Sequence, residues 1–141
     1  MSKNCVEILA AIAAAQSEKK PRKRQGEEEH LIQVACIDWF RWTHPNLRKN
    51  LFAVPNGGWR NAAVAGKLKA EGVLAGVADL ILLVANSRHG ALLIEMKKKG
   101  GAQSDKQKEW QTAMENSGYK YVICHSLDEF QKEIDSYLTI K

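Results

Sequence analysis

Residues 77–97 read VADLILLVANSRHGALLIEMK, and this stretch decides the fold. Two apolar runs, at residues 77–84 and 91–97, have the composition of buried β-strands. The polar residues 86–90 between them predict a turn. We therefore expect two strands, paired as an antiparallel hairpin, at the centre of the molecule.

Charged residues interrupt these apolar runs. Asp79 lies near the start of the first run, and Glu95 and Lys97 end the second. A lone buried carboxylate is costly unless it is paired or bound to a metal. If the hairpin turns about Ser87, Asp79 and Glu95 lie opposite each other on one face, and Lys97 shares that face because side chains alternate along a strand. The sequence therefore predicts that two carboxylates and a lysine converge at one end of the sheet.

This group of side chains suits a hard divalent cation. Mg²⁺ or Mn²⁺ binds carboxylate oxygens and keeps several waters, so that positions stay open for a phosphodiester oxygen. We expect Asp79 and Glu95 to be metal ligands, with the backbone carbonyl of Met96 as a further ligand. Lys97 would orient or deprotonate the attacking water, or act as a fixed positive charge. The alternative is a salt bridge across a hairpin, without chemistry.

The sequence on either side of the hairpin predicts alternating helices and strands. The expected elements are a helix that ends before Pro45, a strand at 51–54, helices at 59–71 and 104–116, a strand at 119–124 and a helix at 126–138. The step from the second hairpin strand through a helix to residues 119–124 should be a right-handed parallel crossover. We therefore predict an α/β fold with a mixed central sheet flanked by helices.

Length and charge indicate one domain with a basic extension. The chain has 141 residues and a net charge of +5, and residues 1–26 hold six basic and two acidic residues. We expect residues 1–26 to be a helical or mobile extension and residues 27–141 to be the domain. A basic tail favours phosphate binding, although a solvated linker explains it equally well. The three cysteines lack metal-site spacing, which fits a reducing cytoplasm, and the apolar runs are too short to span a membrane.

Further residues could contact DNA. The candidates are Asn56, Gly57, Gly58, Arg60, Lys67, Lys69, Lys98 and Lys99. The segment at 56–58 could bring backbone amides to a phosphate or form a simple turn. The basic side chains could contact phosphates or be solvated surface charges.

Five motifs stand in order along most of the chain. They are EHLIQ at 29–33, PNGGWR at 55–60, KAEGVLAGVADL at 69–80, IEMK at 94–97 and QSDKQKEW at 103–110. Together they resemble the VRR-NUC family, a branch of the PD-(D/E)xK nuclease superfamily, from about Glu29 to Tyr137. One departure is Ala78, which stands where the motif usually has proline; that proline shapes the backbone and takes no part in the chemistry.

The resemblance implies a restriction-endonuclease-like core and hydrolysis of DNA with Mg²⁺ or Mn²⁺. It assigns metal binding to Asp79 and Glu95 and the role of catalytic lysine to Lys97. It also implies that Glu29 adds an acidic group, directly or through water, and that Gln107 is an active-site helix residue. Glu29 is only one of three acids at a helix start, however, and Gln107 is also explained as a capping-box residue.

We expect a stand-alone domain without accessory DNA-binding modules, similar to phage and bacterial members of the family. For those members the resemblance implies homodimers that act on branched DNA such as four-way (Holliday) junctions. A two-fold dimer presents two identical sites, which suits symmetric incision. Three alternatives remain: a nicking or flap nuclease, a DNA-binding module with an inactive site, and an α/β interaction domain without chemistry. The intact Asp79, Glu95 and Lys97 argue against an inactive site.

Overall fold

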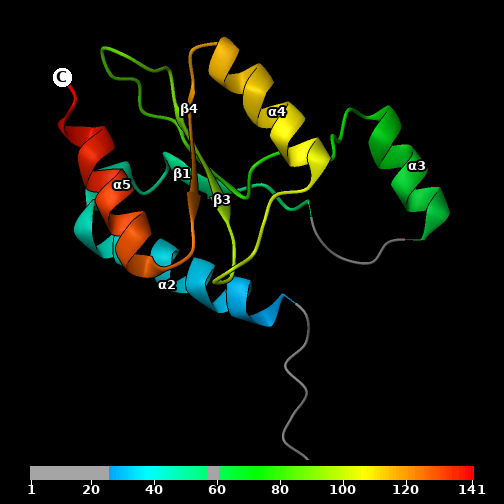
Figure 1. Cartoon of the computed structure of the whole chain (residues 1–141), viewed down its shortest axis with the longest axis horizontal. Helices are drawn as coiled ribbons and strands as arrows, with labels where there is room; N and C mark the ends of the chain where they lie inside the picture. The colour runs from blue at the N-terminus through cyan, green and yellow to red at the C-terminus, as the bar shows by residue number, and fades with distance from the viewer. Residues whose placement is uncertain (1–25, 57–60) are drawn as a thin grey trace, which may run out of the picture.

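The computed structural model describes residues 26–56 and 61–141, which form a four-stranded sheet flanked by helices (Figure 1). In chain order the elements are α2 (Glu27–Thr43), the 3₁₀ helix η1 (Pro45–Leu47), β1 (Leu51–Ala53), α3 (Ala62–Ala70), β2 (Leu80–Leu82), β3 (Leu92–Met96), α4 (Asp105–Asn116), β4 (Lys120–Cys124) and α5 (Leu127–Thr139). Residues 1–25 and 57–60 lie outside the described part, so the division of the chain at residue 27 remains a prediction. No helix of the described part is long and apolar enough to cross a membrane.

The sheet is mixed, as the sequence predicts. Its order is β1-β2-β3-β4, with β1, β2 and β3 antiparallel in turn and β3 parallel to β4. Ile81 pairs with Leu93 and Leu82 pairs with Leu92. This is the register that a hairpin centred on Ser87 requires. The α/β class, the hairpin and the parallel crossover through α4 are therefore confirmed.

The strand predicted at residues 77–84 is much shorter than expected. Beyond Leu82 the Leu83 N–H still donates to the Asn50 carbonyl at 2.8 Å, in register with β1. The Leu83 carbonyl, however, accepts from the Asn50 side-chain amide at 2.6 Å, because the Asn50 backbone N–H bonds to Leu47. At the other end, the carbonyl of Val77 accepts from the side-chain amide of Asn56 at 3.1 Å. Backbone groups on both sides of β2 thus bond to loop residues, and the strand keeps only three residues.

The helix predicted at residues 59–71 also differs in its first turn. In the structure α3 begins at Ala62, and Asn61 caps it by accepting from the Val64 N–H at 2.9 Å. An extended residue with a side-chain acceptor is a preferred helix start. Gly72 follows the end of α3 with φ +98°, the left-handed conformation in which glycine commonly ends a helix.

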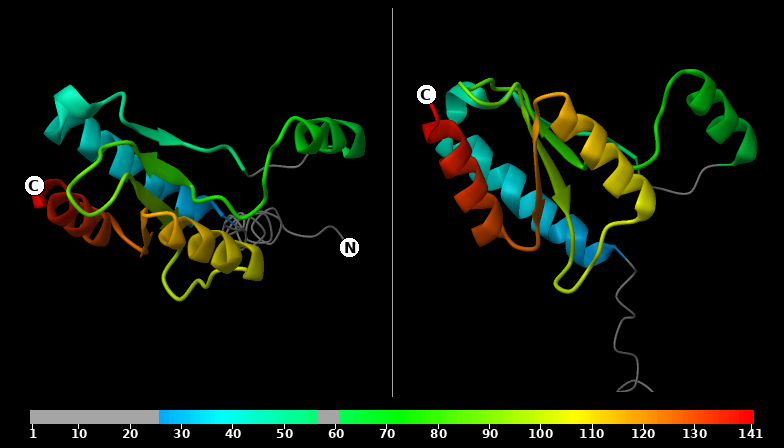
Figure 2. Two further views of the ribbon diagram at one scale, coloured as in Figure 1. Left: turned by 90° about the horizontal axis from the view of Figure 1, so that it is seen from above. Right: turned by 45° about the horizontal axis from the view of Figure 1, so that its top comes forward.

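Side chains that alternate along β3 enter two different cores. Leu92, Ile94 and Met96 belong to the larger core, which packs on α2 and α5. Leu93 faces the other way and joins a smaller core with Ala78 and Tyr121, against Trp110 and Met114 of α4. Helices α2 and α5 lie side by side, and α3 stands apart from the sheet beyond α4 (Figure 2).

Candidate active site

The centre of the site is Glu95, the only charged residue that is buried in the described part of the chain. It is 1% exposed and lies on the face of β3 that packs towards α4. Its Oε1 accepts from Lys97 Nζ at 2.8 Å and from Gln107 Nε2 at 2.5 Å, and its Oε2 accepts from Tyr121 OH at 3.2 Å. These donors compensate a carboxylate whose burial would otherwise be strongly unfavourable.

Lys97 follows β3 and points to the same face as Glu95. Its side chain is 13% exposed, so the ammonium group is largely shielded from water. Burial alone would lower its pKa, but the hydrogen bond to Glu95 and the charges of Glu95, Glu29 and Asp79 together raise the pKa above its ordinary value. The ammonium form is therefore the stable form at neutral pH.

Asp79 immediately precedes β2 and reaches across to β3. Its Oδ2 accepts from the backbone N–H of Met96 at 2.8 Å, which fixes the carboxylate beside Glu95. Burial is the main cause that raises the pKa of Asp79, and the charge of Glu29 adds to it. Burial is also the largest cause that raises the pKa of Glu95. The hydrogen bond from Lys97 opposes this rise, and the charge of Asp79 adds to it. The charge of Asp79 thus disfavours the ionised form of Glu95, as expected for a site that gains from a cation.

Glu29 comes to the edge of the same site from the first turn of α2. Its Oε1 accepts from the backbone N–H of Lys98 at 3.1 Å, so α2 is tied to the segment that follows β3. Glu29 is half-buried, whereas Glu27 and Glu28 are exposed. The geometry therefore agrees with the choice of Glu29 among the three consecutive acids.

Gln107 is both a capping-box residue of α4 and a contact of the buried Glu95. Its Oε1 accepts from the Ser104 N–H at 2.8 Å, and its backbone N–H donates to Ser104 Oγ at 3.3 Å, which completes a capping box. Its Nε2 donates to Glu95. One side chain therefore caps α4 and holds the buried carboxylate, and this links the start of the helix to the site.

Tyr121 and Gln103 belong to the site but are missed by the sequence analysis. The Tyr121 hydroxyl donates to Glu95, and Gln103 Nε2 donates to the Tyr121 oxygen at 3.3 Å and to Gln111 Oε1 at 2.9 Å. Burial and the charge of Glu95 raise the pKa of Tyr121, so its hydroxyl keeps the proton it donates. The sequence carries no local signal for them, because the parallel register that puts residues 93, 95 and 121 on one face joins segments separated by a crossover.

Gly76 is a second residue that the sequence analysis did not assign to the site. Its φ is +90°, and a Cβ there would lie 2.6 Å from the carbonyl oxygen of Lys106. The loop that leads to Asp79 therefore packs backbone to backbone on the first turn of α4, which carries Gln107. Only glycine allows both this conformation and this approach.

The donor set fits a magnesium-like ion that keeps part of its water. In residues 26–56 and 61–141 no three His, Cys, Asp or Glu side chains are grouped to hold a metal by themselves. Mg²⁺ and Mn²⁺ do not need such a cage, because one or two carboxylates with waters suffice. Asp79, Glu95 and the predicted Met96 carbonyl are hard oxygen donors of this kind.

The predicted DNA contacts are distributed unevenly around this centre. Gly57, Gly58 and Arg60 lie outside the described residues. Asn56 bonds to Val77, which supports the turn. Lys98 and Lys99 are exposed in the segment directly after β3, close to the carboxylates. Two more lie on α3: Lys67 is exposed and lies 3.9 Å from Glu71, and Lys69 lines a groove between α3 and α4.

Comparisons with known proteins cover the part of the chain that holds this site. The family model of the VRR-NUC domain matches residues 17–128, which include every residue of the site described above. A solved structure described as a VRR_NUC domain protein superposes with a TM-score of 0.71 and is 25% identical, over 82% of this chain and 92% of that chain. A search of curated proteins found no match. The match of the family model over most of the chain shows that it belongs to the VRR-NUC family of nucleases.

Proposed function

We propose that the chain is a Mg²⁺- or Mn²⁺-dependent endonuclease that hydrolyses DNA phosphodiester bonds and acts as a homodimer on branched DNA such as four-way junctions. The observation that carries the proposal is the buried Glu95, which lies beside Asp79 and 2.8 Å from Lys97 Nζ. A fold that needed only stability would place an apolar side chain at this position. We expect the enzyme to work in the cytoplasm of a bacterial or phage-infected cell.

Asp79, Glu95 and the Met96 carbonyl would hold the ion, with Glu29 acting through water. When bound, the ion would lower the pKa of a water molecule and would offset negative charge on the phosphoryl group. The protein contributes fixed geometry. Met96 N–H orients Asp79, and the amide of Gln107 and the hydroxyl of Tyr121 orient the two oxygens of Glu95. Such preorganised groups need little rearrangement during the reaction.

Lys97 would act as a positive charge, because Glu95 holds its ammonium group at 2.8 Å. Its raised pKa keeps the ammonium group protonated at neutral pH. A shielded ammonium next to the reacting phosphate stabilises charge that develops on the phosphoryl oxygens. The same group can donate a hydrogen bond that orients the attacking water.

An exposed apolar stripe on α2 supports the homodimer. Leu31, Val34 and Trp42 lie on one side of the helix with exposed fractions of 61%, 44% and 82%. Sedimentation at micromolar concentration should show a dimer for the wild type and a monomer for Trp42→Glu. Leu83, which is 53% exposed on another part of the molecule, provides the matched control Leu83→Glu. A monomeric wild type would refute the dimer without touching the nuclease proposal.

The nuclease proposal is tested by cleavage of a panel of labelled DNAs. The panel contains a four-way junction, a flap, a nicked duplex, an intact duplex and a single strand, each with Mg²⁺, Mn²⁺ or EDTA. We expect metal-dependent cutting of the junction that Lys97→Ala abolishes. Lys132→Ala, an exposed lysine of α5, should cut like the wild type. Cutting of only the flap or the nicked duplex would favour those alternatives, and binding without cutting would indicate an inactive module.

A further inference from the structure

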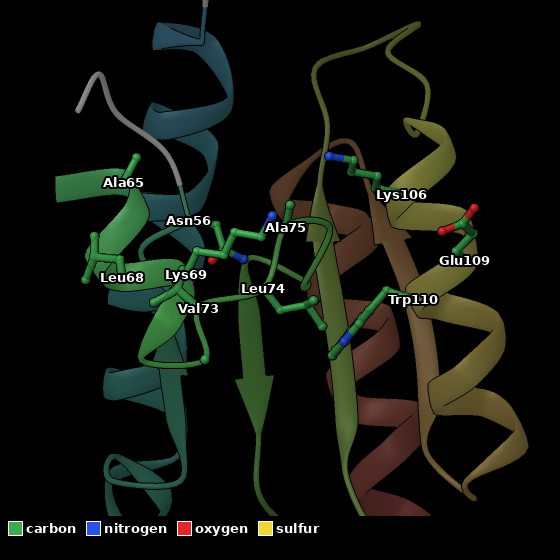
Figure 3. A pocket seen from close by; sticks show the side chains of 11 residues that line it. Asn56, Ala65, Leu68, Lys69, Val73, Leu74, Ala75, Lys106, Glu109 and Trp110 are labelled. Atoms are coloured by element: carbon green, nitrogen blue, oxygen red, sulfur yellow. The ribbon is translucent and has the colours of Figure 1, made fainter. Parts of the chain in front are cut away.

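A groove of about 790 Å³ lies between α3 and α4, and Lys106, the neighbour of Gln107 in the chain, lines it. Figure 3 shows side chains of both helices and of the connecting loop around it, with Leu74 and Trp110 facing each other. Its volume is in the range of small-molecule sites, which is enough for one nucleotide. None of its lining residues belongs to the catalytic group described above.

The floor of the groove is apolar and accessible. Leu74 and Val73 are 57% and 41% exposed, and Leu68 continues the surface from α3. Trp110 closes the floor on the α4 side, where its ring is held at the edge of Tyr121 with 6.1 Å between ring centroids. Exposed apolar side chains gathered in a concave surface indicate a binding site rather than chance exposure.

The rim of the groove is predominantly basic. Lys69 comes from α3 and Lys106 from the first turn of α4, and Glu109 is the acidic residue among the lining side chains. In Figure 3 Lys106 and Glu109 extend in different directions from α4. An apolar floor below two ammonium groups matches the chemistry of a nucleotide, which has a flat base and a negatively charged phosphate.

The groove is physically joined to the active site. Lys106 precedes Gln107, whose amide donates to Glu95. Gly76, near the Val73–Leu74 floor in the chain, packs on the Lys106 backbone. A strand whose scissile phosphate reached Glu95 would therefore pass close to the groove.

We propose that this groove binds one unpaired nucleotide of the DNA substrate, with the base on the apolar floor and a phosphate between Lys69 and Lys106. The inference rests on the proposed nuclease function and names a substrate feature for it. A base inside an intact duplex is stacked and paired, so it cannot present its face to the groove. The enzyme would therefore select DNA that has unpaired nucleotides near the cleavage point, as in gaps, flaps and open junction centres.

The test measures binding in EDTA, where no cleavage takes place. Fluorescence anisotropy compares a paired duplex with the same duplex carrying a short gap of unpaired thymidines. We expect the wild type to prefer the gapped DNA roughly tenfold, since stacking of a base on protein side chains contributes about this much or more. Leu74→Ser and the double variant Lys69→Ala/Lys106→Ala should abolish the preference. The matched controls Leu83→Ser and Lys132→Ala, which are exposed elsewhere, should retain it.

Two results would overturn the inference. One is a wild type that binds both DNAs equally, and the other is a preference that survives in both groove variants. If Leu74→Ser instead converted a dimer to a monomer and left the DNA preference intact, the groove would be an interface between copies of the chain. Thermal unfolding of each variant checks that the fold is kept, which is expected because Leu74 is exposed.

Cleavage with Mn²⁺, measured in parallel, separates this inference from the proposed function. Loss of the gap preference in the groove variants, together with an inactive wild type, would refute the nuclease and leave the nucleotide site standing. Active cleavage with no effect of the groove variants would refute the nucleotide site alone.

Discussion

The two faces of the sheet are built for different purposes. On the α2 and α5 side, Ile94 and Met96 are sealed in an apolar core. On the α4 side, Leu93 shares a smaller core, and Glu95 near the end of β3 and Lys97 just after it lie on the same face. Because side chains alternate along β3, one short strand supplies stability to one face and chemistry to the other. The comparison shows that the buried charge of Glu95 lies on the face whose apolar core is the smaller of the two.

The largest effects are expected from single substitutions at two neighbouring residues of β3, one on each face of the sheet. Ile94→Asn places an amide in the apolar core and should cost about 4 kcal/mol or more of unfolding free energy. Glu95→Gln keeps the shape of the side chain and should leave the protein folded, but cleavage should fall roughly a thousandfold because a proposed metal ligand is lost. Chemical denaturation and cleavage rates measure both variants. A folded, unchanged Ile94→Asn variant or an active Glu95→Gln variant would break the comparison.

Gly76→Ala tests whether the α4 face depends on the contact between the Asp79 loop and the helix. The added Cβ meets the Lys106 carbonyl, and the backbone is in the left-handed region. We expect a cost of roughly 2 kcal/mol and a fall in cleavage of roughly a hundredfold, because reacting groups are displaced. Gly118→Ala is the matched control, since Gly118 has φ +91° but open space around it. Equal cleavage rates for the two variants would show that the contact does not position the site.

Gln107→Ala separates the two roles of one side chain. Loss of the capping box should lower stability by about 1 kcal/mol, and loss of the bond to Glu95 should lower cleavage roughly tenfold. Ser104→Ala breaks the same capping box but does not touch Glu95. We therefore expect similar denaturation midpoints for the two variants and a reduced cleavage rate only for Gln107→Ala. If Gln107→Ala and Ser104→Ala lost the same amount of cleavage, Gln107 would act on the site only through the capping box.

The smallest expected effect is a gain in stability. The pKa of Asp79 is raised in the folded protein, mainly by burial, so its ionised form destabilises the fold. This destabilisation is present above the folded pKa and is lost as the pH falls through it. In EDTA at neutral pH, Asp79→Asn should therefore raise Tm by a few degrees, with a smaller difference in acid. A lower Tm for Asp79→Asn than for the wild type at neutral pH would show that ionised Asp79 stabilises the fold, against this prediction.

Much of the site could be predicted because it depends on local rules. The turn centred near Ser87 and the alternation of side chains were enough to place Asp79, Glu95 and Lys97 on one face, and the observed register agrees. The capping box at Ser104 is equally local and is confirmed. The choice of Glu29 came from the family resemblance, and its bond to Lys98 is consistent with that choice.

The remaining features depend on contacts between distant segments. Tyr121 reaches Glu95 only because β4 adopts one particular register beside β3, and the sequence of a crossover does not define that register. At the end of β2 the Leu83 carbonyl accepts from the side chain of Asn50, 33 residues away, and the composition of the strand does not reveal this partner. The groove depends on where α3 lies relative to α4, and no periodicity in the chain encodes this.

The central claim is most directly tested by the rate of junction cleavage as a function of Mn²⁺ concentration, with wild type and Lys97→Ala purified in parallel. The parallel preparation reveals any contaminating nuclease. The account predicts a rate for the wild type that rises with the metal and saturates, and no cleavage by Lys97→Ala at any metal concentration. Equal rates for the two proteins, or a wild-type rate that does not depend on the metal, would contradict it.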